Sequence, residues 1–220
     1  AKKEAKGYYA HCSAIDKSIA EILSTIDEEG IRENTVFILT SDHGEMLGSQ
    51  GVDPKLKQVP FAESANVPFI LRYPAVTGNI GRLVQMPVTT PDIFPTLLGL
   101  ANIPIPKSCE GDDLSSFICR NQDDPHRAVL YMNISPFIKQ EYAIAYRAIK
   151  TNQYTYIRSI NGPWFLFDDN KDPFQMNNLL TNKSFDKIRK ILDTRLYKLL
   201  KKNGDEFQTG AFYLKKWGYH

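Results

Sequence analysis

The sequence predicts an α/β domain followed by a smaller α+β subdomain. In the first part of the chain, an amphipathic helical pattern precedes a short apolar strand, and a second apolar run follows a loop. After residue 125, short alternating segments replace these patterns, and a helical apolar stripe comes after them. We therefore expect an α/β domain over residues 1–125 and a C-terminal subdomain, an antiparallel sheet plus a helix, over residues 126–220.

The first expected element is an amphipathic helix over residues 13–29. Its apolar residues recur at intervals of three and four, which places them on one face, and Gly30 is a typical stop signal. The members of this stripe are Ile15, Ile19, Ile22, Leu23 and Ile26. A strand at residues 35–40 follows, so we expect the helix to pack on a sheet face.

Two more elements complete the expected first domain. Residues 67–73 form a near-continuous apolar run, a pattern typical of a buried parallel strand. Residues 93–100 fit a short helix that the chain enters through Pro91 and Asp92. The loop at residues 48–60 has little periodicity, and loops near strand ends often carry function.

The subdomain is predicted from four short alternating segments and one helix. The segments fit antiparallel strands at residues 128–133, 142–150, 154–160 and 164–167. The helix has an apolar stripe that can cover one face of their sheet, formed by Phe185, Ile188, Ile191, Leu192, Leu196 and Leu199. Basic residues between positions 183 and 202 lie opposite this stripe, which favours a solvated face over a binding face for a sulfated polysaccharide.

Composition excludes several classes of protein. The 27 basic and 25 acidic residues leave a net charge of +2, which gives no reason to expect a nucleic-acid partner. No apolar run approaches 18 residues, so no membrane span is expected in this sequence. The three cysteines have no metal-type spacing and are odd in number, so they predict no disulfide framework.

The strand at residues 35–40 leads into Asp42, His43 and Gly44, and these are the strongest candidates for chemistry. Ligands of α/β sheets bind outside the carboxyl ends of strands, where loops gather polar groups. A carboxylate in that position suits a hard cation, although Asp42 could equally cap a following helix. His43 could be a ligand or a loop histidine satisfied by a main-chain carbonyl, as lone histidines often are.

Four ordered segments together carry a family resemblance. The first runs from the strand through the Asp-His-Gly triplet to Pro74, and the second is Pro-Asp-Ile-Phe-Pro-Thr-Leu-Leu at residues 91–98. The others are Arg-Ala-Ile-Lys-Thr at residues 147–151 and Asp-Pro-Phe-Gln-Met-Asn-Asn-Leu at residues 172–179. In this order they resemble the second half of a sulfatase of the alkaline-phosphatase superfamily, and the resemblance covers nearly the whole chain.

The resemblance implies a function and a set of site residues. It implies metal-dependent hydrolysis of sulfate monoesters of sugars or aryl groups, with Asp42 and His43 as metal ligands and His43 within the catalytic site. It implies that Lys57 binds the sulfate group, with Lys55 as the competing lysine. Calcium is the expected cation. Mg²⁺ and Mn²⁺ are alternatives, because an imidazole ligand suits transition metals better than it suits calcium. A periplasmic or secreted location is also implied.

Departures from the family pattern leave the substrate open. Gln50 stands where the resemblance leads us to expect histidine, Ala62 where it leads us to expect glutamate, and Asn66 where it leads us to expect arginine. A related activity on phosphonate or phosphate esters is therefore an alternative, since those enzymes share the Asp-His-Gly triplet.

The nucleophile that the resemblance implies is not found in this sequence. Sulfatases carry two adjacent metal-binding acids and a Cys-x-Pro-x-Arg or Ser-x-Pro-x-Arg segment whose first residue becomes formylglycine. None of the three cysteines, Cys12, Cys109 and Cys119, is followed by the x-Pro-x-Arg part of this motif. We therefore expect the chain to lack the N-terminal half of the enzyme, which would be its partner, and to be inactive alone.

A partial α/β core has a further consequence. It exposes a sheet edge and an uncovered apolar face, so we expect the isolated chain to self-associate. A non-catalytic remnant that serves only in assembly is the alternative from a different functional class.

Overall fold

The computed structural model describes residues 2–134 and 144–218, which divide into two compact units. The N-terminal unit comprises residues 1–57 and 63–82, and the C-terminal unit comprises residues 58–62 and 83–220. The predicted α/β class is confirmed, since helices and strands alternate through the first part and a separate antiparallel sheet follows. The domain boundary after residue 125 stays a prediction.

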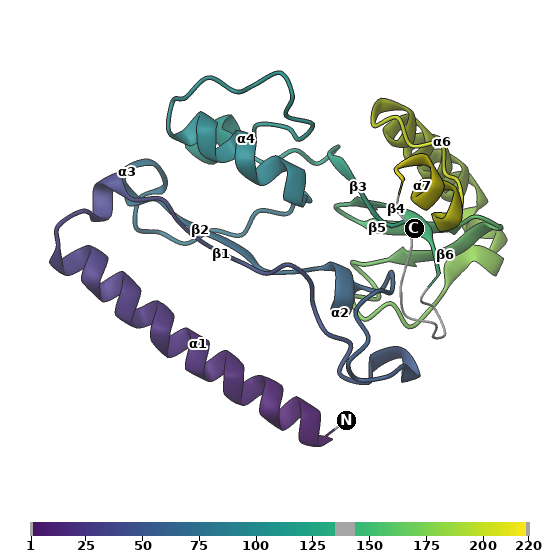
Figure 1. Cartoon of the computed structure of the whole chain (residues 1–220), viewed down its shortest axis with the longest axis horizontal. Coiled ribbons are helices and arrows are strands. Elements are labelled where there is room, and N and C mark those ends of the chain that lie inside the picture. Colours follow the sequence, from purple (N-terminus) through teal and green to yellow (C-terminus); the bar gives the residue numbers. More distant parts are fainter. Residues whose placement is uncertain (1, 135–143, 219–220) are drawn as a thin grey trace. The chain divides into compact units, whose positions relative to one another are not determined.

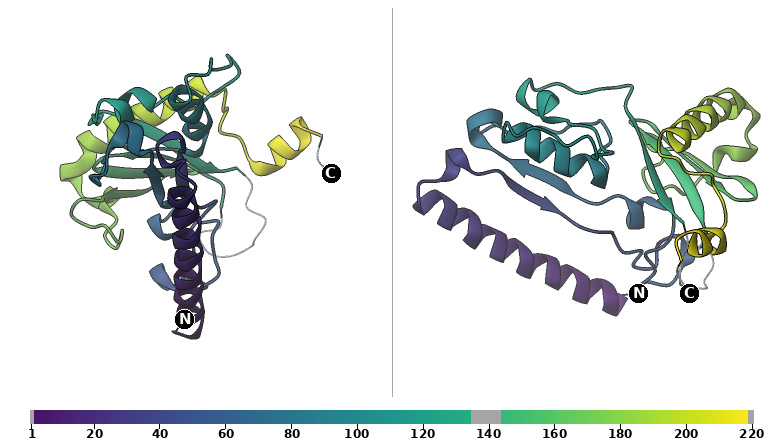
Figure 2. Two further views of the ribbon diagram at one scale, coloured as in Figure 1. Left: turned by 90° about the vertical axis from the view of Figure 1, so that its left-hand side faces the viewer. Right: turned by 45° about the horizontal axis from the view of Figure 1, so that its top comes forward.

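The N-terminal unit contains one long helix and a two-stranded sheet. Helix α1 spans Lys2–Glu28 and is drawn as one unbroken rod in Figure 2. It begins well before the predicted residue 13, because the preceding lysines, alanines and Glu4 also favour a helix. None of its residues is buried, and an ion pair between Asp27 Oδ1 and Arg72 Nη2, 2.8 Å apart, ties its end to the second strand.

The strands of this unit are β1 (Phe37–Thr40) and β2 (Phe69–Arg72). They pair antiparallel, with Phe37 opposite Arg72 and Thr40 opposite Phe69, so the prediction of a buried parallel strand at residues 67–73 is wrong. The segment between the strands brings the chain back beside Thr40, the last residue of β1, where β2 begins. An apolar run predicts neither the direction of a strand nor its burial. Ile70 on β2, for example, is 56% exposed.

The C-terminal unit is built on a four-stranded antiparallel sheet, as predicted (Figure 1). Its strands lie in chain order and are β3 (Ala128–Asn133), β4 (Tyr146–Thr151), β5 (Tyr154–Ser159) and β6 (Gly162–Asp168). The beginning of the strand predicted at residues 142–150 falls on positions 142 and 143, which lie outside the described residues.

Helix α6 (Asp186–Lys202) supplies one side of the core of this unit. The core cluster consists of Ile149, Tyr156, Leu166, Leu192, Leu196 and Leu200. The predicted stripe thus held two of the three fully buried leucines, whereas Ile191 is 46% exposed and Leu200 was missed. The stripe continues one residue beyond the last predicted position.

Shorter helices complete the described structure. They are α2 (Ala62–Ala65), α3 (Pro74–Thr77), α4 (Thr90–Leu100), α5 (Ser115–Cys119) and α7 (Gly210–Lys216), with single 3-10 turns at Arg32–Asn34, Ser49–Gly51, Leu179–Thr181 and Lys183–Phe185. Helix α4 confirms the one predicted at residues 93–100. Thr89 and Asp92 form a capping box at its start, which explains why the chain enters the helix there. Among the described residues no helix is long and apolar enough to cross a bilayer.

Candidate active site

Asp42 lies two residues beyond the end of β1, and its carboxylate faces solvent. The side chain is 83% exposed, and Oδ1 accepts hydrogen bonds from the main-chain N–H of His43 at 2.9 Å and from Ser41 Oγ at 3.2 Å. The His43 N–H, followed by the imidazole charge, lowers the pKa of Asp42. No helix begins in residues 42–48, so Asp42 is not a helix cap and its Oδ2 is available to a ligand.

His43 directs one ring nitrogen to the main chain and the other toward Asp42. Nδ1 lies 2.9 Å from the carbonyl oxygen of Gly44, and because a carbonyl only accepts, the ring proton is on Nδ1. Nε2 lies 3.5 Å from Asp42 Oδ2. The expected carbonyl contact of a loop histidine is therefore present, and it leaves Nε2 facing the carboxylate of Asp42.

Gly44 is required by a close approach of the chain. A Cβ at this position would lie 2.0 Å from the carbonyl oxygen of Glu63, which no side chain can tolerate. The N–H of Gly44 donates to the carbonyl of Ser64 at 2.8 Å, so residues 63 and 64 lie directly against the Asp-His-Gly loop. The third residue of the triplet thus brings helix α2 into contact with the Asp-His-Gly loop.

Ser64 joins this loop to the one that carries Lys57. Its hydroxyl donates to the carbonyl of Lys57 at 2.6 Å, while its own carbonyl accepts from Gly44. Ser64 is only 3% exposed, so both bonds are shielded from water. This serine is not among the predicted site residues, because periodicity carries no signal for a hydrogen bond to the main chain of a neighbouring segment.

Two main-chain hydrogen bonds hold the same loops together further out. Met46 N donates to Leu56 O at 3.2 Å, and Leu47 N donates to Pro54 O at 2.9 Å. The side chains of Met46 and Leu56 are buried beneath them. The structure therefore brings the main chain of Lys57 into one hydrogen-bonded arrangement with the Asp-His-Gly loop, and the lysine itself is exposed.

The donors of Asp42 and His43 fit part of a cation site. A carboxylate oxygen and an imidazole nitrogen with its proton on the far side of the ring are normal metal ligands. Within residues 2–134 and 144–218, no group of three or more histidines, cysteines and acids could hold a metal ion. Calcium takes six to eight oxygen ligands. The two residues therefore account for a part of a coordination shell.

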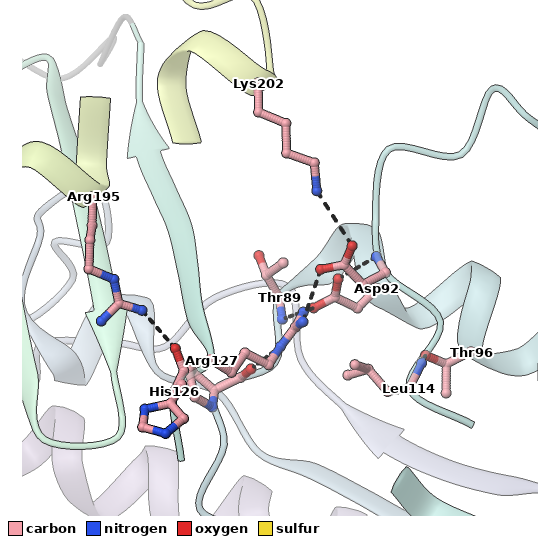
Figure 3. Close-up of polar contacts among 10 residues, drawn as sticks. Thr89, Asp92, Thr96, Leu114, His126, Arg127, Arg195 and Lys202 are labelled. Atoms are coloured by element: carbon pink, nitrogen blue, oxygen red, sulfur yellow. Dashed lines mark hydrogen bonds and ion pairs between the residues drawn. The ribbon is translucent and has the colours of Figure 1, made fainter. Parts of the chain in front are cut away.

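A second charged cluster surrounds Arg127 and is fully paired (Figure 3). Arg127 Nη2 donates to Asp92 Oδ2 at 2.7 Å and Nη1 donates to Asp112 Oδ2 at 2.9 Å, while Lys202 Nζ lies 3.5 Å from Asp112 Oδ1. Burial works to lower the pKa of Arg127, but the hydrogen bonds that it donates to both carboxylates outweigh this effect and raise that pKa. The cluster borders a cavity of about 370 Å³ that no predicted site residue lines. Mutual neutralisation indicates a structural role.

Two family models match the chain. The model described as "N-sulphoglucosamine sulphohydrolase, C-terminal" matches residues 56–202, and the model described as "Sulfatase" matches residues 2–103. Together they cover residues 2–202, which include both loops of the site.

Curated relatives agree. An ulvan-active sulfatase of Formosa agariphila is 45% identical over 218 residues, which are 99% of this chain and 43% of that protein. An arylsulfatase of Clostridium perfringens is 33% identical over 87% of this chain and 40% of its own length. The chain therefore spans about two fifths of the length of these relatives.

Solved structures share the fold. A protein in complex with its substrate D-glucosamine-2-N,6-O-disulfate matches 88% of this chain and 39% of its own, with a TM-score of 0.71 and 24% identity. The phosphonate monoester hydrolase of Agrobacterium radiobacter matches 86% of this chain and 40% of its own, with a TM-score of 0.70 and 24% identity. Sequence and fold together show that this chain belongs to the sulfatase family.

Proposed function

We propose that the full-length protein hydrolyses sulfate monoesters of a carbohydrate. The observation that carries the proposal is the arrangement around Ser64, which ties the loop of Asp42 and His43 to the loop of Lys57. An acid and imidazole pair and a lysine are then held by one set of hydrogen bonds. The ulvan-active relative, at 45% identity, supports a polysaccharide as the source of the ester.

Each of the three residues has a distinct role in this proposal. Asp42 Oδ2 and His43 Nε2 bind a divalent cation, with Ca²⁺ expected first and Mg²⁺ or Mn²⁺ as alternatives. When bound, such a cation polarises the ester oxygens and favours an ionised nucleophile. Lys57 places an ammonium group against the sulfate oxygens and offsets the charge that grows on the leaving oxygen as the bond to sulfur breaks.

The nucleophile is the part of the reaction that these residues do not supply. Resemblance implies a formylglycine, and this sequence has no Cys-x-Pro-x-Arg or Ser-x-Pro-x-Arg segment. We therefore expect no turnover of 4-nitrophenyl sulfate by the 220 residues alone. Turnover that disappears in an Asp42→Ala variant would contradict this expectation.

The test of the site measures kcat/KM for 4-nitrophenyl sulfate with the full-length protein in a calcium buffer. We expect Asp42→Asn and Lys57→Ala each to lower kcat/KM by about 100-fold or more, since each removes a group that stabilises charge in the transition state. Lys55→Ala is the matched control, because Lys55 is also an exposed lysine of the same loop. A loss in Lys55→Ala equal to that in Lys57→Ala would transfer the sulfate-binding role to Lys55.

Removal of the cation gives a second, independent readout. We expect EDTA to abolish turnover and added Ca²⁺ to restore it more fully than Mg²⁺ or Mn²⁺ does. Activity that survives EDTA would contradict the metal-binding role of Asp42 and His43.

A phosphonate or phosphate ester hydrolase is the second candidate, and the likeness to the Agrobacterium enzyme supports it. Turnover of 4-nitrophenyl sulfate and 4-nitrophenyl phenylphosphonate by the same preparation separates the two. A sulfatase turns over the sulfate with the higher kcat/KM, whereas the reverse order favours the phosphonate hydrolase. Absence of both activities in the full-length protein would favour a non-catalytic role in assembly.

A further inference from the structure

Five residues that directly follow Lys57 are held by the C-terminal sheet through their main chain. Residues 58–62, which we call the anchor strip, belong to the C-terminal unit although both flanking segments belong to the other. Tyr131 Oη donates to the carbonyl of Pro60 at 2.8 Å, and Tyr146 Oη donates to the carbonyl of Val59 at 3.3 Å. Two side chains of neighbouring strands therefore hold two successive peptide groups of the strip.

Gln175 holds the far end of the anchor strip. Its Oε1 accepts from the main-chain N–H of Ala62 at 2.9 Å, and its Nε2 donates to Asp169 Oδ1 at 2.9 Å. The other oxygen of Asp169 accepts from Lys150 Nζ and Thr155 Oγ1, each at 2.7 Å. The Ala62 N–H can only donate and the Asp169 carboxylate can only accept, so one orientation of the Gln175 amide satisfies both partners. Gln175 is 3% exposed.

Side-chain packing fixes the strip between these bonds. Val59 is fully buried and Phe61 is 3% exposed. The ring of Phe61 lies 5.2 Å from that of Phe165 and 6.4 Å from that of Phe167, between centroids. The strip is therefore immobilised by apolar contacts as well as by hydrogen bonds.

Lys57 lies between two fixed points. Its own carbonyl accepts from Ser64 Oγ, and the residue after it begins the anchor strip. The side chain of an exposed lysine has four rotatable bonds, so its ammonium group can occupy many positions around the main chain. Fixing the main chain limits the region that the ammonium group can reach. Displacement of a catalytic group by about 1 Å can cost 100-fold in rate.

We propose that Tyr131, Tyr146 and Gln175 are positioning residues for Lys57. They fix the main chain that follows the lysine and thereby hold its ammonium group where the sulfate group binds. The proposal rests on the proposed function, because it takes the role of Lys57 from there. It adds that two tyrosines of the C-terminal sheet and one glutamine of the same unit set the effectiveness of that lysine.

The variants remove the anchoring atoms and keep the packing. Tyr146→Phe combined with Gln175→Met takes away one phenol and one amide that hold the strip. The matched control is Tyr156→Phe combined with Gln153→Met, since Tyr156 donates to Asp193 and Gln153 donates to Asp168 in the same unit without touching the strip. Both pairs lose one phenol oxygen and one side-chain amide from the same unit.

The first measurement is hydrogen exchange of the Ala62 amide in the chain described here. We expect exchange to be at least about tenfold faster in the anchor variant than in the control variant, because the variant loses the bond that protects the Ala62 N–H and a second bond to the strip. Equal exchange in both variants would overturn the anchoring itself.

The second measurement is a double-mutant cycle on kcat/KM for 4-nitrophenyl sulfate with the full-length protein. We expect the anchor variant to lose about tenfold when Lys57 is present and less than twofold when Lys57 is alanine, because its effect passes through the lysine. A loss of the same factor in both backgrounds is what a merely structural role gives, and it would overturn the proposal.

Failure of the proposed function looks different from failure of this inference. If the unsubstituted protein turns over no sulfate ester, the proposed function falls and this inference falls with it. If the unsubstituted protein is active and the anchor variant matches it while Ala62 exchanges faster, the sulfatase stands and the positioning role is overturned.

Discussion

The two units bury their apolar residues to very different degrees. In the C-terminal unit, three leucines of α6 and three residues of the sheet form a core in which none is more than 3% exposed. In the N-terminal unit, the 27 residues of α1 include none that is buried, although the helix carries a full apolar stripe. Both units nevertheless contain regular helices and strands.

The difference teaches that regular structure and a closed core are separate properties. Periodicity predicts the second half of helix α1, and the helix formers before it extend the helix to Lys2. Stability of a helix in a protein comes mostly from packing of its apolar face. The unit with Asp42 and His43 is therefore the less consolidated one among the described residues, and the unit with the anchor strip is the more consolidated.

The sharpest test of this contrast deletes one buried and one exposed aliphatic side chain. We expect Leu196→Ala to lower the free energy of unfolding by about 2–5 kcal/mol, because Leu196 is fully buried. We expect Ile22→Ala, at a side chain that is 50% exposed, to change it by less than about 0.5 kcal/mol. Urea unfolding measures both variants. Tryptophan fluorescence reports on Leu196→Ala, because Trp164 and Trp217 lie in the C-terminal unit, and circular dichroism at 222 nm reports on Ile22→Ala in the long helix of the N-terminal unit.

Acid should weaken the C-terminal unit through Asp205. Burial works to raise the pKa of this carboxyl, but hydrogen bonds from Arg147, Tyr213 Oη and the N–H of Phe207 outweigh it, and the pKa is lowered. A lowered pKa contributes stability that is complete above the unfolded value near 3.8 and is lost as pH falls through the folded value.

A neutral substitute for Asp205 isolates this effect. We expect Asp205→Asn to cost about 1.5–3 kcal/mol at pH 6, because it removes charged hydrogen bonds to the fully buried Arg147. The difference in the free energy of unfolding between this variant and the unsubstituted protein should become smaller as pH falls below about 4. A difference that stays constant between pH 6 and pH 3, in the same urea assay, would contradict the role of Asp205.

Two glycines of the N-terminal unit should respond to alanine in opposite directions. At Gly44 the added methyl meets the carbonyl of Glu63, so we expect a loss of about 1–3 kcal/mol and separation of the two site loops. At Gly7, in the interior of α1, nothing lies within 4 Å, and alanine should stabilise the helix by about 0.5–1 kcal/mol. Circular dichroism at 222 nm during urea unfolding measures both, and a loss at Gly7 would contradict the open surroundings of α1.

The smallest expected effect concerns self-association of the isolated chain. We expect the exposed stripe of α1 to drive it, since Ile15 and Ile22 are each at least half exposed. Ile15→Gln combined with Ile22→Gln should weaken the association constant by about fivefold. Sedimentation velocity over a concentration series gives this value. A chain that sediments as a monomer at its highest soluble concentration would contradict the expectation.

Periodicity predicted those elements whose partners are close in sequence. Strands β4, β5 and β6 of the C-terminal unit follow one another through short turns, and the four strands lie in chain order, so pattern and topology coincide. The direction of β2 could not be predicted in this way, because an apolar run has no signal for the strand beside it. Leu200 escaped for a simpler reason, since the stripe was ended one residue early.

The candidate site was predictable in its residue types and hidden in its connections. Asp42, His43 and Lys57 stand out as residues that follow a strand or occupy a functional loop. Ser64 and Gln175 do not stand out, because each acts through a hydrogen bond to the main chain of a residue distant in sequence. No side-chain pattern announces such a bond, whereas a structure shows it directly.

The anchor strip also bears on how this site can evolve. Tyr131, Tyr146 and Gln175 recognise peptide groups, and a peptide group is the same whatever side chain it carries. A lineage can therefore exchange Ala62 for a larger or charged residue and inherit the hold on its N–H unchanged. Substitution of the side chain at position 62 therefore leaves the hydrogen bonds to the anchor strip in place. Substrate preference can change at position 62 while the main chain of Lys57 stays in the same position.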